Sequence, residues 1–184
     1  MNKSLQRKQG IINSGSLEHA ATYSKVISEK LLSSSEYKSA KVVFTYNPFK
    51  GEADISDFNK YAESHGKIVA YPICLGGGNM VAAVPKPGAS WVEGKFGLMS
   101  PTIEGATIVP PEGINLVIVP CVAFSPKNMM RLGMGGGYYD RYLPKCINAK
   151  CIAAAFEIQR IDELCTDPWD APLDAIVTEL KRYV

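Results

Sequence analysis

The residues best suited to chemistry lie in one glycine-rich segment, 131–143, which reads Arg-Leu-Gly-Met-Gly-Gly-Gly-Tyr-Tyr-Asp-Arg-Tyr-Leu. Glycine lets the backbone adopt positive φ angles and approach a ligand closely. Successive turns of this kind direct several N–H groups into one concave space, which suits phosphate. The residues after Gly137 look like the start of a helix, and a helix N-terminus adds partial positive charge. The segment therefore favours a phosphate site.

Charged and aromatic side chains surround these glycines at fixed offsets. Arg131 and Arg141 could supply positive charge, and Asp140 could hold a metal ion against phosphate oxygens. Tyr138 and Tyr139 offer flat faces to a ring, although adjacent tyrosines at a helix start also serve as core anchors. A bare glycine run is usually an ordinary turn. The combination with Arg, Tyr-Tyr and Asp shifts the interpretation toward a nucleotide.

Two further cations lie near the N-terminus. A short helix is predicted over residues 2–12, although Gly10 weakens it. Lys3 and Arg7 lie one turn apart on this helix and repel each other unless an anion sits between them. They either contact an anionic ligand or form a solvated basic face at a frayed terminus.

Candidate acids lie near the ends of other predicted elements. Glu52 follows the first strand and could orient a polar ligand, although a lone loop glutamate is more often solvated. Mg²⁺ needs only one or two carboxylates together with substrate phosphates. Asp140 is one candidate; Asp170 is better explained as a cap or turn residue, and Asp174 suits a ligand or a turn equally well.

The elements that must position these residues form an α/β pattern. A strand at 41–46, a helix from about 54 that stops at Gly66, and a strand at 68–71 closed by Pro72 predict a right-handed parallel βαβ unit. The apolar run 116–119 predicts a strand buried on both faces. The glycine-rich segment then lies beyond the carboxyl end of a central strand, where open α/β sheets bind ligands.

The remaining segments are predicted as follows. Ser16 is a plausible N-cap for a second helix, which the serine run at 33–35 ends. The glycine triplet 76–78 is better explained by a hairpin than by a phosphate loop, because no helix follows it. Residues 85–113 lack periodicity and suggest a lid or binding loop. A strand at 151–156, a short helical piece at 161–164 and a strand at 175–178 complete the chain.

Length and composition describe an ordinary globular protein. The 184 residues fit one domain, 1–184, with 46% hydrophobic and 21% charged residues and a net charge of +2. That charge gives no case for nucleic acid or a membrane surface, and no apolar run reaches spanning length. The five cysteines show no Cys-x-x-Cys spacing, which points to a reducing cytoplasm. No Ser–His–Asp or Cys–His arrangement is apparent.

The assembled residues resemble one family closely, that of 5-formyltetrahydrofolate cyclo-ligase, also called 5,10-methenyltetrahydrofolate synthetase. The resemblance covers nearly the whole chain, and Arg-Leu-Gly-x-Gly-x-Gly-Tyr-Tyr-Asp at 131–140 is its most specific part. The pair Lys3 and Arg7, Gly51-Glu52, and the segment 172–179 occur in family order. Gly136 and Met134 stand where some relatives carry Lys or Arg, and Gly10 interrupts the N-terminal helix.

The resemblance implies an enzyme that uses ATP and Mg²⁺ to convert 5-formyltetrahydrofolate to 5,10-methenyltetrahydrofolate, with release of ADP and phosphate. The formyl oxygen would attack the γ-phosphate, N10 would attack the imidate phosphate carbon, and phosphate would leave. The implied fold is a three-layer open, mainly parallel sheet with helices on both faces (the NagB/RpiA/CoA transferase-like class). The resemblance further implies a monomer that takes small-molecule substrates.

The resemblance also implies roles for individual residues. Arg131 and Tyr139 would be catalytic. ATP would contact Lys3, Arg7, Arg131, Gly133, Met134, Gly135, Gly136, Gly137, Tyr138 and Tyr139. The folate substrate would contact Asn47, Glu52, Met80, Phe96, Tyr138 and Tyr139. Asp140 and Asp174 would hold Mg²⁺. The alternatives are a family member that binds folate or nucleotide without turnover, and a different enzyme on the related isomerase or CoA-transferase type of fold.

Overall fold

A single eight-stranded sheet organises the protein. The computed structural model describes residues 2–94 and 97–184, so Phe96, expected near the folate, lies outside the described residues. The strand order is β12-β11-β10-β7-β1-β2-β3-β6. The strands are β1 Val42–Phe44, β2 Ile68–Gly76, β3 Asn79–Pro85, β6 Ala106–Val109, β7 Leu116–Pro120, β10 Lys150–Ala154, β11 Ala175–Val177 and β12 Arg182–Tyr183.

The centre of this sheet is parallel and its margins are antiparallel. Strands β11, β10, β7, β1 and β2 pair in parallel, whereas β12, β3 and β6 run antiparallel to their neighbours. Helix α4 (Ser56–Ser64) connects β1 to the parallel strand β2. The predicted mainly parallel sheet and its βαβ unit are confirmed.

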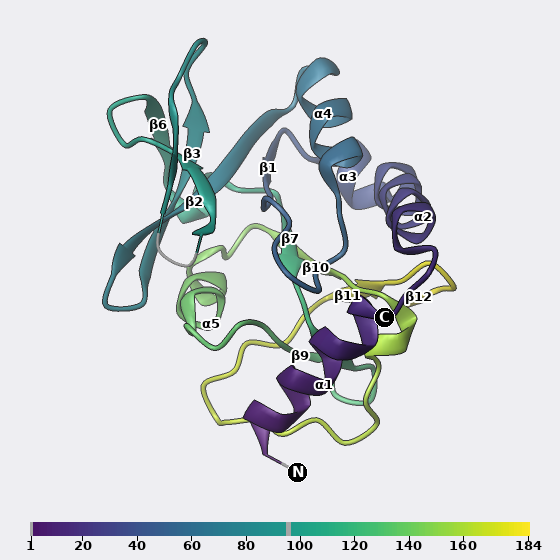
Figure 1. Ribbon diagram of the computed structural model, residues 1–184. Helices are drawn as coiled ribbons and strands as arrows, with labels where there is room; N and C mark the ends of the chain where they lie inside the picture. Colours follow the sequence, from purple (N-terminus) through teal and green to yellow (C-terminus); the bar gives the residue numbers. More distant parts are fainter. Residues whose placement is uncertain (1, 95–96) are drawn as a thin grey trace.

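Helices cover the two faces unequally (Figure 1). Helices α2 (Ala20–Ser33) and α3 (Ser35–Ser39) join α4 over one face, where Ile27, Tyr37 and Phe58 pack against the strands. The short helix α5 (Tyr138–Tyr142) and the 3₁₀ turn η3 (Leu143–Lys145) lie over the other. Strand β7 serves both layers because its residues alternate between the two clusters, as predicted for a strand buried on both faces.

Helix α1 (Lys3–Gly15) confirms the predicted N-terminal helix and extends it. Gly10 does not interrupt it, contrary to expectation. This residue is buried, and a Cβ there would collide with the carbonyl oxygen of Val122, so glycine lets α1 approach the segment after β7. The helix packs against β8 (Ala123–Ser125) and the 3₁₀ turn η4 (Glu157–Gln159). This contact fixes the N-terminal cations beside the sheet.

Several predicted boundaries were wrong. Ser16 caps the C-terminus of α1, and α2 starts at Ala20. Strand β2 passes through Pro72 because β1 pairs with it only as far as Ala70, so no β1 carbonyl needs the missing N–H. The triplet 76–78 does form the predicted hairpin turn between β2 and β3.

The later segments also differ from the prediction. Residues 85–113 are more regular than expected, since they contain β6, a hairpin of β4 (Trp91–Glu93) and β5 (Met99–Pro101), and the 3₁₀ turn η2 (Pro111–Gly113). The 161–164 segment is not helical, and η4 comes before it. The strands predicted at 151–156 and 175–178 correspond to β10 and β11. Within 2–94 and 97–184, no helix has the length and apolar character needed to cross a membrane.

Candidate active site

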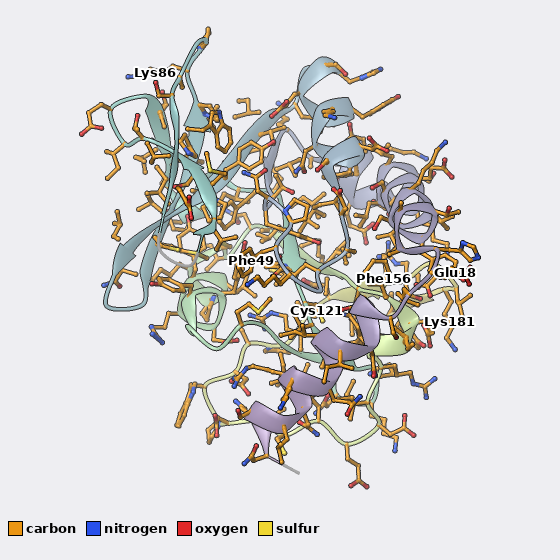
Figure 2. All side chains as sticks on the ribbon, in the orientation of Figure 1. Glu18, Phe49, Lys86, Cys121, Phe156 and Lys181 are labelled. Carbon is orange, nitrogen blue, oxygen red and sulfur yellow. The ribbon has the colours of Figure 1, made fainter. Side chains whose placement is uncertain are left out.

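A cleft of about 540 Å³ lies beyond the carboxyl ends of β1 and β7. Residues from both ends of the chain line it, as does Phe49, which is labelled near the middle of the view in Figure 2. The cleft brings together nearly all the residues singled out in the sequence: Lys3, Arg7, Asn47, Glu52, Met80, Arg131, Gly133, Met134, Gly135, Gly136, Gly137, Tyr138, Tyr139, Asp140 and Arg141.

The glycine loop, residues 133–137, enters this cleft between β9 (Met130–Leu132) and α5. The antiparallel pair of β8 and β9 precedes it, so the loop does not follow β7 directly. Gly137 has φ 65° and caps α5, a conformation that other residues adopt at a cost. Arg141 donates from Nη2 to Gly136 O at 3.1 Å and from Nε to Gly78 O at 3.3 Å. These bonds tie the loop to the β2–β3 turn.

Arg131 organises the acidic side of the cleft. Its buried guanidinium donates from Nη2 to Asp140 Oδ1 and from Nη1 to Ala171 O, both at 3.0 Å. Ala171 N also donates to Asp140 Oδ1 at 3.3 Å. Asp140 is therefore fixed to the backbone directly after Asp170. Nothing in the sequence around Arg131 indicates that its side chain bonds to Ala171, which lies 40 residues later.

Lys3 joins the N-terminus to the same acidic segment. Its Nζ donates to Asp167 Oδ2 and Asp170 Oδ2, each at 2.6 Å. Burial alone would lower the pKa of the ammonium, but these two hydrogen bonds and the carboxylate charges raise it above its ordinary value. Gln6, which the sequence analysis did not select, is buried and bonds to Glu163 O and Cys165 N. Helix α1 is thereby attached to the 163–170 segment.

Arg7 reaches the glycine loop from the same helix, with Nε donating to Gly133 O at 2.9 Å. Protein groups receive both cations here: two carboxylates accept from Lys3, whereas Arg7 donates to a neutral backbone carbonyl. We call this side the charged wall, defined as the glycine loop with Lys3, Arg7, Arg131, Asp140, Asp167 and Asp170.

Asp174 is not brought to the cleft. Its Oδ1 pairs with Lys150 Nζ at 2.7 Å, and its Oδ2 accepts from Cys151 N at 2.9 Å. The physical reason is its position directly before β11, which places it at the amino ends of the parallel strands, opposite the ligand edge. Asp170 is the turn residue expected from the sequence, since its Oδ2 accepts from Asp167 N at 2.8 Å, and it also lines the cleft, with Asp167 and the 70% exposed Trp169 beside it.

A second group of residues that line the cleft, which we call the buried wall, consists of Tyr46, Asn47, Glu52, Met80 and Tyr139. Glu52 Oε2 accepts a hydrogen bond from Phe49 N at 2.9 Å. Burial raises the pKa of Glu52 to about 8, although that backbone bond opposes the shift. Asn47 Nδ2 donates to Met99 O in β5 at 3.0 Å. The wall therefore holds a carboxyl group that stays largely protonated at neutral pH.

Tyr139 stands beside this carboxyl with an unused hydroxyl group. Its ring stacks on Phe44, with centroids 6.0 Å apart. The hydroxyl oxygen is buried and has no hydrogen-bond partner among the described residues. Burial, followed by the charge of Glu52, holds the pKa of Tyr139 well above its ordinary value. A buried hydroxyl without a partner costs about 1–3 kcal/mol, so a polar ligand at this point would relieve that cost.

Known proteins match both the sequence and this architecture. A sequence profile of the 5-formyltetrahydrofolate cyclo-ligase family matches residues 4–179. The 5-formyltetrahydrofolate cyclo-ligase of Escherichia coli strain K12 is 30% identical over 148 residues, which cover 78% of this chain and 81% of that protein. The Haemophilus influenzae 5-formyltetrahydrofolate cyclo-ligase is 28% identical over 160 residues, covering 85% and 84%.

Solved structures agree. The NMR structure of Aquifex aeolicus 5,10-methenyltetrahydrofolate synthetase has a TM-score of 0.84 and 32% identity, and covers 100% of this chain and 92% of that chain. A 5,10-methenyltetrahydrofolate synthetase structure from Mycoplasma pneumoniae, at 24% identity, shares the fold, with a TM-score of 0.79 and coverage of 97% and 99%. Because the profile spans residues 4–179 and a relative is 30% identical across most of both chains, this chain belongs to the 5-formyltetrahydrofolate cyclo-ligase family.

Proposed function

We propose that the protein uses ATP to convert 5-formyltetrahydrofolate to 5,10-methenyltetrahydrofolate, releasing ADP and phosphate. One observation carries the proposal beyond family membership. A single cleft is lined both by a glycine loop with paired charges and by the buried wall, whose Glu52 has a raised pKa and can donate a hydrogen bond in its neutral form. A phosphate chain and a formyl-bearing ring need these two different environments within reach of each other.

The charged wall would hold the nucleotide. In the reaction, the formyl oxygen attacks the γ-phosphorus, the bond from that phosphorus to the bridging oxygen breaks, and ADP leaves. The loop N–H groups, Lys3 and Arg7 neutralise and position the phosphoryl group, which is most of what phosphoryl transfer asks of a protein. Arg131 is held by Asp140 and Ala171 O, so its role is to orient Asp140 while it adds charge to the site.

The buried wall would hold the folate. N10 then attacks the imidate phosphate carbon, the carbon–oxygen bond breaks, phosphate leaves and N10 loses its proton. Tyr139, with its unpaired hydroxyl, donates a hydrogen bond to the substrate. Glu52, protonated at neutral pH, is a second donor beside it. Asn47 and Met80 complete the predicted folate contacts along this wall.

Magnesium fits the charged wall only in the company of phosphate. No group of three or more His, Cys, Asp or Glu side chains within 2–94 and 97–184 could hold a metal by itself. Asp140 accepts a hydrogen bond from the backbone N–H of Ala171, the residue directly after Asp170, so the two acids belong to neighbouring segments. Mg²⁺ is commonly bound through one or two carboxylates plus substrate phosphates. We therefore assign the ion to Asp140 and Asp170 rather than to Asp174. Beside Asp140 and Asp170 the ion would neutralise phosphate charge.

Three further predictions accompany this function. The protein acts as a monomer on small molecules. It works in the cytoplasm, where the five cysteines, which show no Cys-x-x-Cys spacing, would remain reduced. Its sheet is related to that of the NagB/RpiA/CoA transferase-like class.

An absorbance assay tests the function directly. Purified protein with 5-formyltetrahydrofolate and Mg-ATP should accumulate methenyltetrahydrofolate, and omission of ATP should abolish the signal. Absence of product at saturating substrates would refute the proposal. Calorimetric binding of ATP without phosphate release would then identify a family member that binds nucleotide without turnover.

A further inference from the structure

We propose that Lys3 is an exchangeable counter-ion: without nucleotide its ammonium group occupies the carboxylates of Asp167 and Asp170, and an arriving triphosphate draws it away. A divalent cation then gains access to Asp170 only when nucleotide is bound. The inference rests on the proposed function, because it concerns the same cleft. It adds a role for Asp167, as a positioning residue that holds Lys3 in place.

The geometry of Asp170 carries the first step. Its side chain is only 7% exposed, and its Oδ2 accepts from both Lys3 Nζ at 2.6 Å and Asp167 N at 2.8 Å. The Oδ2 atom, which already receives two donors, has little capacity for a cation, and the Lys3 ammonium beside it repels a cation from the same carboxylate. Asp140 Oδ1 is in the same situation, with Arg131 Nη2 and Ala171 N as its donors. The nucleotide-free wall is thus neutralised internally.

The mobility of Lys3 carries the second step. Lys3 is the first residue of α1, whereas the contacts of Gln6 that attach this helix lie one turn later. A lysine side chain is a flexible stem with a point charge, and it forms no bidentate fork that would lock it to one partner. Asp167, at 42% side-chain exposure, is the more solvated of its two carboxylates, so that contact is the easier one to exchange. The ammonium can therefore turn into the cleft without moving the helix.

The charge of the ligand supplies the driving force. A triphosphate carries more negative charge than the two carboxylates together and offers many acceptor oxygens in the same cleft, which Lys3 and Arg7 both line. Once Lys3 turns to phosphate, Asp167 and Asp170 lose their counter-ion and attract a cation. Nucleotide and cation then bind with positive coupling, and by linkage each strengthens the other by the same factor.

Binding of Mn²⁺, followed by electron paramagnetic resonance of the free ion, tests the inference in the full-length protein. The wild type should bind Mn²⁺ weakly alone and roughly 5- to 150-fold more tightly with a non-hydrolysable ATP analogue. Lys3→Met leaves the carboxylates without their counter-ion, so nucleotide-free affinity for Mn²⁺ should rise about tenfold or more, and the coupling factor should fall correspondingly. Lys3→Gln provides the same test with a polar side chain if the Met variant does not fold.

Arg7→Met is the charge-matched control, because it removes one positive charge from the same helix without freeing a carboxylate. Its nucleotide-free affinity for Mn²⁺ should change by no more than about threefold, the size of one screened charge. Equal gains in the Lys3 and Arg7 variants, or no gain in either, would overturn the exchange. The Mn²⁺ measurement needs no turnover, so a protein inactive on 5-formyltetrahydrofolate could still pass it, and an active one could still fail.

Discussion

The two walls of the cleft deal with charge in opposite ways. On the charged wall, Lys3 and Arg131 each meet a carboxylate at hydrogen-bonding distance, between 2.6 and 3.0 Å. On the buried wall, burial raises the pKa of Glu52 to about 8 and so favours its neutral form. The Tyr139 hydroxyl there has no hydrogen-bond partner among the described residues. One wall compensates its ions with other ions, and the other suppresses ionisation through burial.

The difference teaches how one small domain can handle a polyanion and an amide-like group side by side. Ion pairs between distant segments stabilise the fold and can be exchanged for ligand charges. Neutral donors in a low-dielectric wall do not attract phosphate, so they remain free for the ring substrate. We therefore expect substitutions of paired ions on the charged wall to lower both stability and turnover. Substitution of the unpaired Tyr139 hydroxyl on the buried wall should lower turnover without lowering stability.

The largest expected effect follows from removing the buried cation of the charged wall. Arg131→Met leaves Asp140 and Ala171 O without their donor. We expect the free energy of unfolding to fall by about 3 kcal/mol, the lower end for a broken buried pair because Asp140 is 23% exposed. Turnover should fall about 10²- to 10³-fold, as for loss of one preorganised electrostatic group. Urea unfolding and the methenyltetrahydrofolate assay measure the two effects.

Arg160→Met is the matched control for that variant. Arg160 pairs with Asp162 at 3.1 Å and more distantly with Glu157 at 3.8 Å, but its own side chain is 38% exposed, in contrast to the buried Arg131. Its loss should lower the free energy of unfolding far less than Arg131→Met does and should leave turnover unchanged. A comparable loss of stability in both variants would show that the charged wall is no more coupled to the fold than the surface is.

The same contrast explains how much of the site could be read from the sequence. The glycine loop was predictable because its residues are adjacent in the sequence and their types are typical of a phosphate site. Folding decides the pairing of Lys3 with Asp167 and Asp170, which lie 164 and 167 residues away. No local pattern marks a lysine that will meet two distant carboxylates, or the buried amide of Gln6.

The position of Asp170 in the cleft and of Asp174 outside it has a simpler cause. Both residues lie before the last parallel strand, and spacing alone favoured neither. Strand direction decides, because Asp174 directly precedes β11 and so belongs to the amino edge of the sheet, away from the ligand edge. Gly10 shows the same limit of local patterns. The low helix propensity of glycine predicted a weak helix at this position, whereas the close approach of α1 to Val122 requires a residue without a Cβ.

A smaller effect on turnover, with no loss of stability, is expected on the buried wall. Tyr139→Phe removes a hydroxyl that has no partner in the described structure, so the free energy of unfolding should stay unchanged or rise by about 1 kcal/mol. The substrate would lose a donor, and kcat/KM should fall about 10- to 100-fold, the value of one hydrogen bond in the transition state. Such a result would separate activity from stability on this wall.

Tyr37→Phe is the control for the tyrosine variant. The Tyr37 hydroxyl is likewise buried without a partner, but its ring packs on Phe58 beneath the helices of the opposite face. Its stability should respond as that of Tyr139→Phe does, and its turnover should match the wild type. If Tyr139→Phe kept full turnover, the hydroxyl would have no part in the reaction.

The remaining prediction concerns the proton on Glu52, whose effect on stability depends on pH. The pKa of this carboxyl rises from 4.5 to about 8 on folding, so between those values the folded protein holds a proton that the unfolded chain has lost. The stability that this proton contributes is complete below pH 4.5 and is lost as the pH climbs toward 8. The slope is at most about 1.4 kcal/mol per pH unit, and less where water reaches the half-buried group.

Glu52→Gln isolates that slope, because the amide keeps an acceptor for Phe49 N and has no proton to lose. Urea unfolding between pH 5 and 8 should show the wild type weakening relative to the variant as the pH rises, with the two closest in stability at the acidic end. Exposed Glu104→Gln should follow the wild-type curve. Parallel curves for Glu52→Gln and the wild type would mean that Glu52 is ionised throughout, and the buried wall would then handle charge as the charged wall does.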